Sequence, residues 1–170
     1  MLLLLFYTGD ERYALECQRV VEVVSLIDLK KLPHAPEYVA GLFNYRGQIV
    51  PVIDLCFLIQ GTPCRRYLST RIIIVNYQGS NADTSSSSQN QPQLVGLMAE
   101  RVTDTLKKTG DFVAPGIVVD TTPYLGGILT DENGMIQLVQ IDRLLEPQLI
   151  NLLPPEAKAE LPVSRLKAAE

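Results

Sequence analysis

The sequence is poor in the residues on which most enzyme active sites are built. Its 170 residues include a single histidine, His34, which stands in a predicted turn between Pro33 and Ala35. One histidine excludes a metal site with two histidine ligands, and no serine motif accompanies it to form a catalytic pair. No glycine-rich loop opens a helix, so a phosphate-binding loop is not indicated. These absences favour a binding protein over an enzyme, and we expect no catalytic residues.

Cysteine is also scarce. The three cysteines, Cys17, Cys56 and Cys64, form no C-x-x-C pair, and their odd number does not indicate a secreted disulfide framework. They lie on apolar runs or beside Pro63, where cysteine usually serves as a small packing residue. We therefore expect reduced thiols in a cytoplasmic protein, and we expect no metal site.

The sequence also lacks an excess of positive charge and long hydrophobic runs. The formal net charge is −4, which argues against a nucleic-acid partner because phosphate binding needs a basic face. The apolar run over residues 2–6 is too short to span a membrane and has no basic start. We expect it to be a buried strand, and we expect no direct membrane contact.

The sequence instead has many short β-branched runs separated by turn residues. This pattern predicts a mainly β protein, with strands over residues 2–8, 13–16, 20–24, 42–45, 48–54, 71–77, 94–99, 125–130 and 135–139. Pro51 inside a strand indicates an edge position or a bulge. Pro36 and Gly41 suggest one helical turn between them. The polar stretch 79–92 is predicted to be a flexible insert within a domain over residues 1–146, and residues 147–170 a partly helical tail.

An internal near-repeat suggests two related halves. The segment from Ala14 to Glu22 aligns with the segment from Gly96 to Asp104, and Tyr38-x-x-Gly41 aligns with Tyr124-x-x-Gly127. In the second pair of segments, Asp54-Leu55 is matched with Asp142-Arg143-Leu144. Two β units packed along a shared seam would explain the repeat, since a unit of about 70 residues buries little surface alone. Convergence of common strand patterns is the alternative.

The most specific stretch begins at Gly41 and ends at Leu55, and it reads GLFNYRGQIVPVIDL. It closely resembles the signature of the CheW family, G-x-x-N-L-R-G-x-x-V-P-V-I-D-L. The resemblance continues through Gly9-Asp10-x-x-Tyr13, Leu32-Pro33-x-x-Pro36 and Tyr124-Leu125-x-Gly127, and it covers residues 1–146. Tyr45, Glu100 and Cys56 depart from the family's usual Leu, Asp and Arg, and the polar insert is long.

The resemblance implies a fold of two small five-stranded, SH3-like β-barrels on a common core. It also implies a cytoplasmic adaptor without catalytic activity or cofactor. Such an adaptor joins the cytoplasmic tip of a chemoreceptor to the regulatory domain of a CheA-type histidine kinase, in swimming chemotaxis or in type IV pilus motility. Two alternatives stay open: a CheW-like interaction module with a different regulatory partner, and an enzyme on a β-barrel scaffold.

The resemblance also suggests which residues bind these partners. The predicted partner-binding set comprises Val20, Glu22, Val23, Gly41, Asn44, Arg46, Gly47, Ile72, Ile73, Gly96 and Val102. Each has a structural alternative. Arg46 presents a planar fork of donors that could reach a partner or brace its own turn, and Asn44 is expected to serve that turn. Val20 and Val23 could be core residues, as could Ile72, Ile73, Gly96 and Val102, which match the receptor-facing groove between the barrels.

Overall fold

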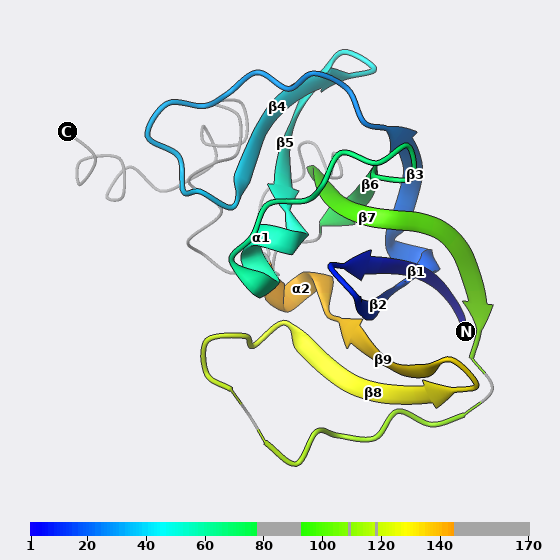
Figure 1. Ribbon diagram of the computed structural model, residues 1–170. Coiled ribbons are helices and arrows are strands. Elements are labelled where there is room, and N and C mark those ends of the chain that lie inside the picture. The colour runs from blue at the N-terminus through cyan, green and yellow to red at the C-terminus, as the bar shows by residue number, and fades with distance from the viewer. Residues whose placement is uncertain (78–92, 109, 118, 145–170) are drawn as a thin grey trace, which may run out of the picture.

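The computed structural model describes residues 1–77, 93–108, 110–117 and 119–144 (Figure 1). Its elements in chain order are β1 (Leu2–Thr8), β2 (Glu11–Glu16), the 3-10 turn η1 (Cys17–Arg19), β3 (Val20–Ser25), β4 (Val39–Tyr45), β5 (Gln48–Asp54), α1 (Leu55–Gln60), β6 (Arg71–Tyr77), β7 (Gln93–Lys107), β8 (Leu125–Asp131), β9 (Gly134–Val139) and α2 (Ile141–Leu144). The predicted polar insert and tail, 79–92 and 147–170, lie outside the described residues.

The strands form two β units, in agreement with the predicted fold. The first unit has the strand order β7-β1-β2-β9-β8, and β2 and β9 run parallel. The second has the order β3-β6-β7-β5-β4, in which β5 and β7 run parallel. Backbone hydrogen bonds of 2.8 Å in both directions between Lys30 and Leu42 bring the chain after β3 against β4 and close the second unit into a barrel.

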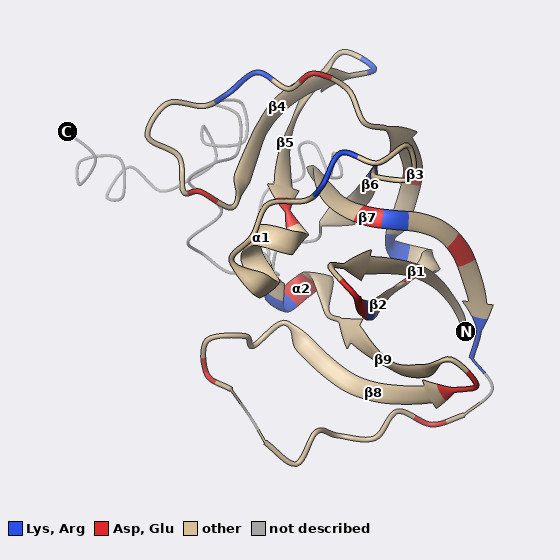
Figure 2. Ribbon diagram, in the orientation of Figure 1, with Lys and Arg blue, Asp and Glu red and all other residues tan. Residues whose placement is uncertain are grey.

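β7 belongs to both units, and Figure 1 shows it curving from one into the other. Its first half pairs with β5 and β6, and its second half pairs with β1. The pairing with β1 shifts register between Leu5 and Tyr7, opposite Arg101, which has a φ of 46°. A bulge of this kind bends a strand, so it directs β7 across the seam. Figure 2 shows an acidic residue followed directly by a basic one there, the sequence pair Glu100-Arg101.

The buried side chains form three clusters that match this architecture. One fills the first unit and includes Leu3, Leu129 and Ile136. Another fills the second unit and includes Phe43, Val50 and Ile72. The largest cluster lies between the units, and its members include Phe6 and Leu15 from one side and Ile53, Ile73 and Leu97 from the other. The predicted common core is therefore confirmed.

The repeat is visible in the backbone hydrogen bonds. The carbonyl of Tyr38 accepts from Asp54 N at 2.7 Å, and the carbonyl of Tyr124 accepts from Gln140 N at 2.8 Å. Each amide lies where a strand, β5 or β9, passes into a short helix. The match of Tyr38 with Tyr124 therefore has a structural basis. The match of Asp54 with Asp142 is wrong by two positions, because Gln140 occupies the place equivalent to Asp54.

Two local predictions need correction, and the sequence missed one element. The chain from Pro36 to Gly41 makes a turn closed by a single bond from Val39 N to Pro36 O, and β4 begins at Val39, so no helical turn forms. The helix α1 was not predicted. β7 continues to Lys107, well beyond the predicted end at residue 99, because β1 supplies its polar second half with backbone partners. Pro51 fits its strand because pairing of β5 with β7 starts only at Val52.

Candidate interaction surface

The strand β3 presents apolar side chains at the outer edge of the second barrel. Among the described strands it pairs only with β6, which leaves its other edge without a ladder partner. Its residues alternate between half-buried and exposed, and the exposed ones include Val21 at 49% and Val23 at 38%. An unpaired strand edge with apolar side chains is a site at which a second β domain can add.

Glu22 connects this strand to the β4–β5 hairpin. Its carboxylate accepts a hydrogen bond from the Tyr45 hydroxyl and another from Arg46 Nη2 at 3.1 Å. The Arg46 guanidinium also lies 5.2 Å from the centre of the Tyr45 ring. The bond to Glu22 raises the pKa of Tyr45, because the carboxylate favours the protonated phenol. Glu22 and Arg46, both predicted partner residues, are therefore partners of each other in the isolated chain.

The Arg46 side chain nevertheless stays accessible, with 76% of its surface exposed. Exposed ion pairs contribute little to stability, so exchanging Glu22 for a partner's carboxylate costs the chain little. The turn itself is held by other contacts. Arg46 and Gly47 have φ values of 50° and 85°, which identify a type I′ turn, and Asn44 Oδ1 accepts from Gly47 N at 2.8 Å. Asn44 therefore has the structural role that the sequence indicated.

Val20 and Gly41, two further members of the predicted set, have structural roles. Val20 packs against the core between the two units. Gly41 lies where the chain after β3 passes over β4, and a Cβ atom there would come within 2.7 Å of Lys30 O. Gly41 therefore permits the contact that closes the second barrel.

The four residues predicted to line a groove between the barrels lie in the core. Ile72 and Ile73 have no exposed surface, Val102 has 7%, and Gly96 is buried. Ile72 and Ile73 are neighbours on β6 and enter different clusters, one inside the second barrel and one at the seam. Direct contact of these side chains with a partner stays a prediction, and the structure shows what they do without one: they fix the position of β6 and β7.

Sequence reasoning missed a depression near the end of β2 and the start of α2. It has a volume of about 270 Å³ and is lined by residues of β2, η1, β9 and α2, among them Glu16, Arg19 and Gln140. Arg19 makes two bonds to the Asp142 carboxylate, at 2.5 and 3.1 Å, and a third to Asn76 O at 3.3 Å. The arginine common to both repeat segments, Arg19 and Arg101, is the signal that could have drawn attention to this position.

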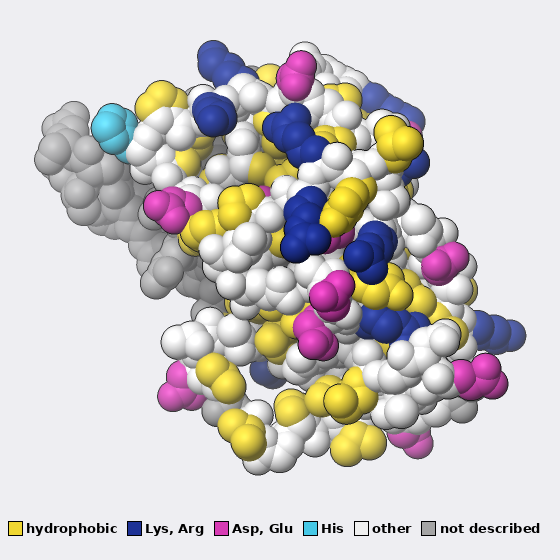
Figure 3. Space-filling model, in the orientation of Figure 1, with side chains coloured by type: hydrophobic (Ala, Val, Ile, Leu, Met, Phe, Trp, Pro, Cys, Tyr) yellow, Lys and Arg dark blue, Asp and Glu magenta, His cyan; other side chains and the backbone are white. Residues whose placement is uncertain are grey.

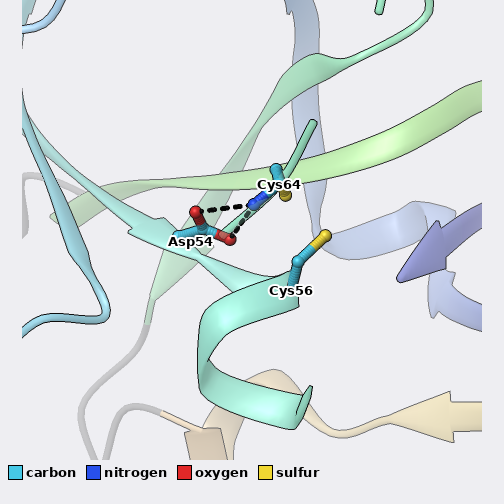
Figure 4. Close-up of side chains that lie close together, drawn as sticks. All are labelled: Asp54, Cys56 and Cys64. Carbon is cyan, nitrogen blue, oxygen red and sulfur yellow. Dashed lines mark hydrogen bonds between the residues drawn. The ribbon is translucent and has the colours of Figure 1, made fainter. Parts of the chain in front are cut away.

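The structure also brings together two of the cysteines. Asp54, Cys56 and Cys64 each offer a ligand atom, and these atoms all lie within 4.8 Å of one another (Figure 4). The hydrogen bond with Cys56, burial, and the charge of Asp54 raise the pKa of the Cys64 thiol well above its usual range. The expectation that the cysteines are packing residues stays a prediction; the sequence did not show that these two, separated by a helix and a loop, lie together.

The remaining surface does not present a single large apolar patch on the face drawn in Figure 3. Hydrophobic side chains there reach the surface in small separate groups, several of them beside basic residues. In the described part of the chain, no helix is long and apolar enough to cross a membrane.

Comparison with known proteins supports one family. The CheW-like domain family matches residues 2–148. The chain is 28% identical to the chemotaxis protein CheW of Klebsiella aerogenes, over 92% of this chain and 88% of that one. It is 30% identical to protein FrzA of Myxococcus xanthus, over 41% of this chain and 43% of that one. The crystal structure of the scaffolding protein TtCheW from Thermoanaerobacter tengcongensis matches with a TM-score of 0.71 and 28% identity, over 87% of this chain and 89% of that one.

The family match extends over both β units, so it includes the β3 edge, the Arg46 turn and the seam together. The members of this family are adaptor proteins without enzymatic activity. The chain belongs to the CheW-like family.

Proposed function

We propose that this chain is a cytoplasmic adaptor that couples a chemoreceptor to a CheA-type histidine kinase. The family supports this role, and the feature that carries it is the β3 edge with its neighbouring ion pair. Val21 and Val23 offer apolar surface, while Glu22 and Arg46 offer opposite charges a short distance away. Apolar centres flanked by polar groups are typical of specific protein interfaces.

The edge of β3 suits the kinase better than the receptor. The regulatory domain of a CheA-type kinase is itself similar to CheW, so it is a β domain that can lie against an unpaired strand. The receptor tip is a helical coiled coil, which needs a groove rather than an edge. We therefore assign Val23, Glu22 and Arg46 to the kinase contact. The buried residues of β6 and β7 contribute indirectly, by holding the barrels in the arrangement that shapes the receptor-facing surface; these residues are Ile72, Ile73, Gly96 and Val102.

The test is calorimetric binding of the chain to the regulatory domain of the CheA-type kinase from the same organism. We expect one-to-one binding at micromolar concentration, weakened at least about tenfold by Val23→Asp, because burying an unpaired carboxylate at an interface costs more than about 1.4 kcal/mol. Met135→Asp is the matched control, since Met135 is 67% exposed on β9 in the other unit. Equal weakening by both variants would show that added charge, and not the β3 edge, governs binding.

A folded chain that binds no such kinase would instead favour the second role, an interaction module with a different regulatory partner. The same calorimetry with the receptor's cytoplasmic fragment separates the two contacts. Val23→Asp should leave receptor binding unchanged if the kinase alone uses the β3 edge. The proposal includes both swimming chemotaxis and type IV pilus motility as the signalling output.

A further inference from the structure

The cluster of Asp54, Cys56 and Cys64 has the composition of a metal site. The three side chains come from the end of β5, the first turn of α1 and the segment between α1 and β6 (Figure 4). Asp54 and Cys56 are only 5% and 2% exposed, and Cys64 is half-buried. Two thiols and a carboxylate suit a borderline-soft divalent cation such as Zn²⁺ better than Mg²⁺ or Ca²⁺, which prefer oxygen ligands alone.

The spacing of the ligand atoms fits such an ion. All of them lie within 4.8 Å of one another. Tetrahedral zinc with Zn–S bonds of about 2.3 Å places its sulfur ligands about 3.8 Å apart. Small side-chain rotations therefore bring the two Sγ atoms and a carboxylate oxygen into place. Cys64 is the most accessible of the three ligands, and Tyr67 and Leu68 further along its segment are exposed.

The surrounding hydrogen bonds already orient the ligands. Asp54 accepts from Phe57 N at 3.0 Å and from Cys64 N at 3.0 and 3.3 Å. A carboxylate has about four acceptor positions, so these two N–H groups leave an oxygen lone pair for a metal. The Cys64 thiol donates to Met98 O on β7 at 3.5 Å, and it gives up this bond when it loses its proton to bind a metal. The bonds to Asp54 do not depend on the thiol proton, so they keep this ligand in place when a metal binds.

The charge of the site also favours a cation. Exchange of two thiol protons for one Zn²⁺, with the protons released to solvent, leaves the net charge of the cluster unchanged. A second buried acid lies close by: Glu100 is 2% exposed, and its Oε1 accepts from Arg65 N, the residue after Cys64, at 2.6 Å. Among the described residues its Oε2 has no hydrogen-bond partner. The nearby Arg65 guanidinium is directed to the Tyr67 hydroxyl at 2.9 Å.

We propose that Asp54, Cys56 and Cys64 bind Zn²⁺, with water as the fourth ligand. The ion joins the 61–70 segment to the end of β5 and to the first turn of α1, and it fixes that segment in place. None of its ligands belongs to β3 or to the turn between β4 and β5.

Cobalt titration of the reduced full-length chain under anaerobic conditions tests this. Co²⁺ bound by thiolates gives an intense charge-transfer absorption, and added Zn²⁺ should remove it. We expect saturation at one Co²⁺ per chain. Cys56→Ser and Cys64→Ser should each lower the intensity by about half or abolish it, because each removes one thiolate. Cys17→Ser is the matched control and should behave as the wild type, since Cys17 is a half-buried cysteine outside the cluster.

The melting temperature provides a second readout. Zn²⁺ at equal concentration should raise it for the wild type and for Cys17→Ser, because a ligand that binds only the folded state stabilises that state. It should not raise it for Cys56→Ser or Cys64→Ser. The proposal is overturned if the reduced wild type shows no charge-transfer absorption, or if the double cysteine variant retains it. The two cysteines are then packing residues or a disulfide-forming pair.

Discussion

Gly96 is the residue whose replacement tests most directly how the interior of the second barrel is packed. It lies on β7 opposite Val52 of β5 and Ile74 of β6. A Cβ atom there would meet Ile72 Cγ2 at 2.8 Å and Val52 Cγ2 at 3.0 Å. Ordinary contact begins at 3.4 Å, so Gly96→Ala requires both neighbours to move by several tenths of an ångström.

The cost can be worked out from these neighbours. Ile72 and Val52 have no exposed surface, and both are β-branched, so their χ1 angles have little freedom to yield. Overpacking of this kind costs about 1–3 kcal/mol. Alanine restricts the unfolded chain and returns about 0.4–1 kcal/mol where the backbone conformation suits it. From the middle of each range, we therefore expect Gly96→Ala to lower the free energy of unfolding by about 1.3 kcal/mol.

Urea denaturation followed by circular dichroism measures this change. The midpoint should fall without a change in the slope, because the extent of unfolding is the same. Gly116→Ala is the matched control: Gly116 is exposed, a Cβ atom there would meet no other atom within 4 Å, and the variant should equal or slightly exceed the wild type in stability. Equal stability of Gly96→Ala and wild type would refute the packing argument. Lost partner binding with unchanged stability would restore direct partner contact as the role of Gly96.

Three further predictions concern polar contacts. Arg12 makes two bonds, 2.6 and 2.8 Å long, to the Asp131 carboxylate, and it holds the pKa of that carboxyl below the usual value. The stability that Asp131 contributes is therefore present above about pH 4 and is lost as the pH falls through this lowered pKa. Asp131→Asn should therefore be less stable than wild type by about 1–2 kcal/mol at pH 7. In thermal melts, the melting temperatures of the two proteins should become equal below about pH 3. A difference in melting temperature that stays the same at every pH would contradict the role of the Asp131 charge. Asp54→Ala removes both the α1 cap and the bond to Cys64 N, so it should lower the free energy of unfolding in urea by about 1–3 kcal/mol. A decrease below about 0.5 kcal/mol, which is typical of a surface substitution, would show that the cap is dispensable. Arg46→Ala should weaken kinase binding in calorimetry while the melting temperature stays near wild type, because its ion pair is exposed; a large fall in melting temperature would identify a structural arginine.

Much of the strand arrangement could be read from the sequence because strand signals are local. β-branched runs bounded by turn residues located most strands, and Arg46-Gly47 between two such runs indicated the tight turn. The helix α1 escaped because its sequence, LCFLIQ, is a short apolar run that periodicity alone cannot distinguish from a buried strand. The flanking residues carried the missing signal: Asp54 caps its start, and Gly61, with a φ of 75°, ends it.

The contacts of the candidate site were harder to predict because they join distant parts of the chain. The sequence selected Glu22 and Arg46 separately, and nothing in their spacing shows that they meet. Val21 was overlooked although it is more exposed than Val23, since alternation within a strand does not say which face is covered. The burial of Gly96 and Val102 likewise depends on how two sheets pack, and that packing has no local signature.

The internal repeat illustrates why residue roles must be taken from geometry. Tyr38 and Tyr124 accept equivalent backbone bonds, so the two halves share a framework. At the next equivalent position the side chains differ. Asp54 caps α1 and joins a buried cluster with two cysteines, whereas Oε1 of Gln140 is buried without a hydrogen-bond partner among the described residues. The two halves share the positions that are fixed by backbone hydrogen bonds, but the side chains at these positions differ. A function found on one barrel therefore cannot be assigned to the other by symmetry.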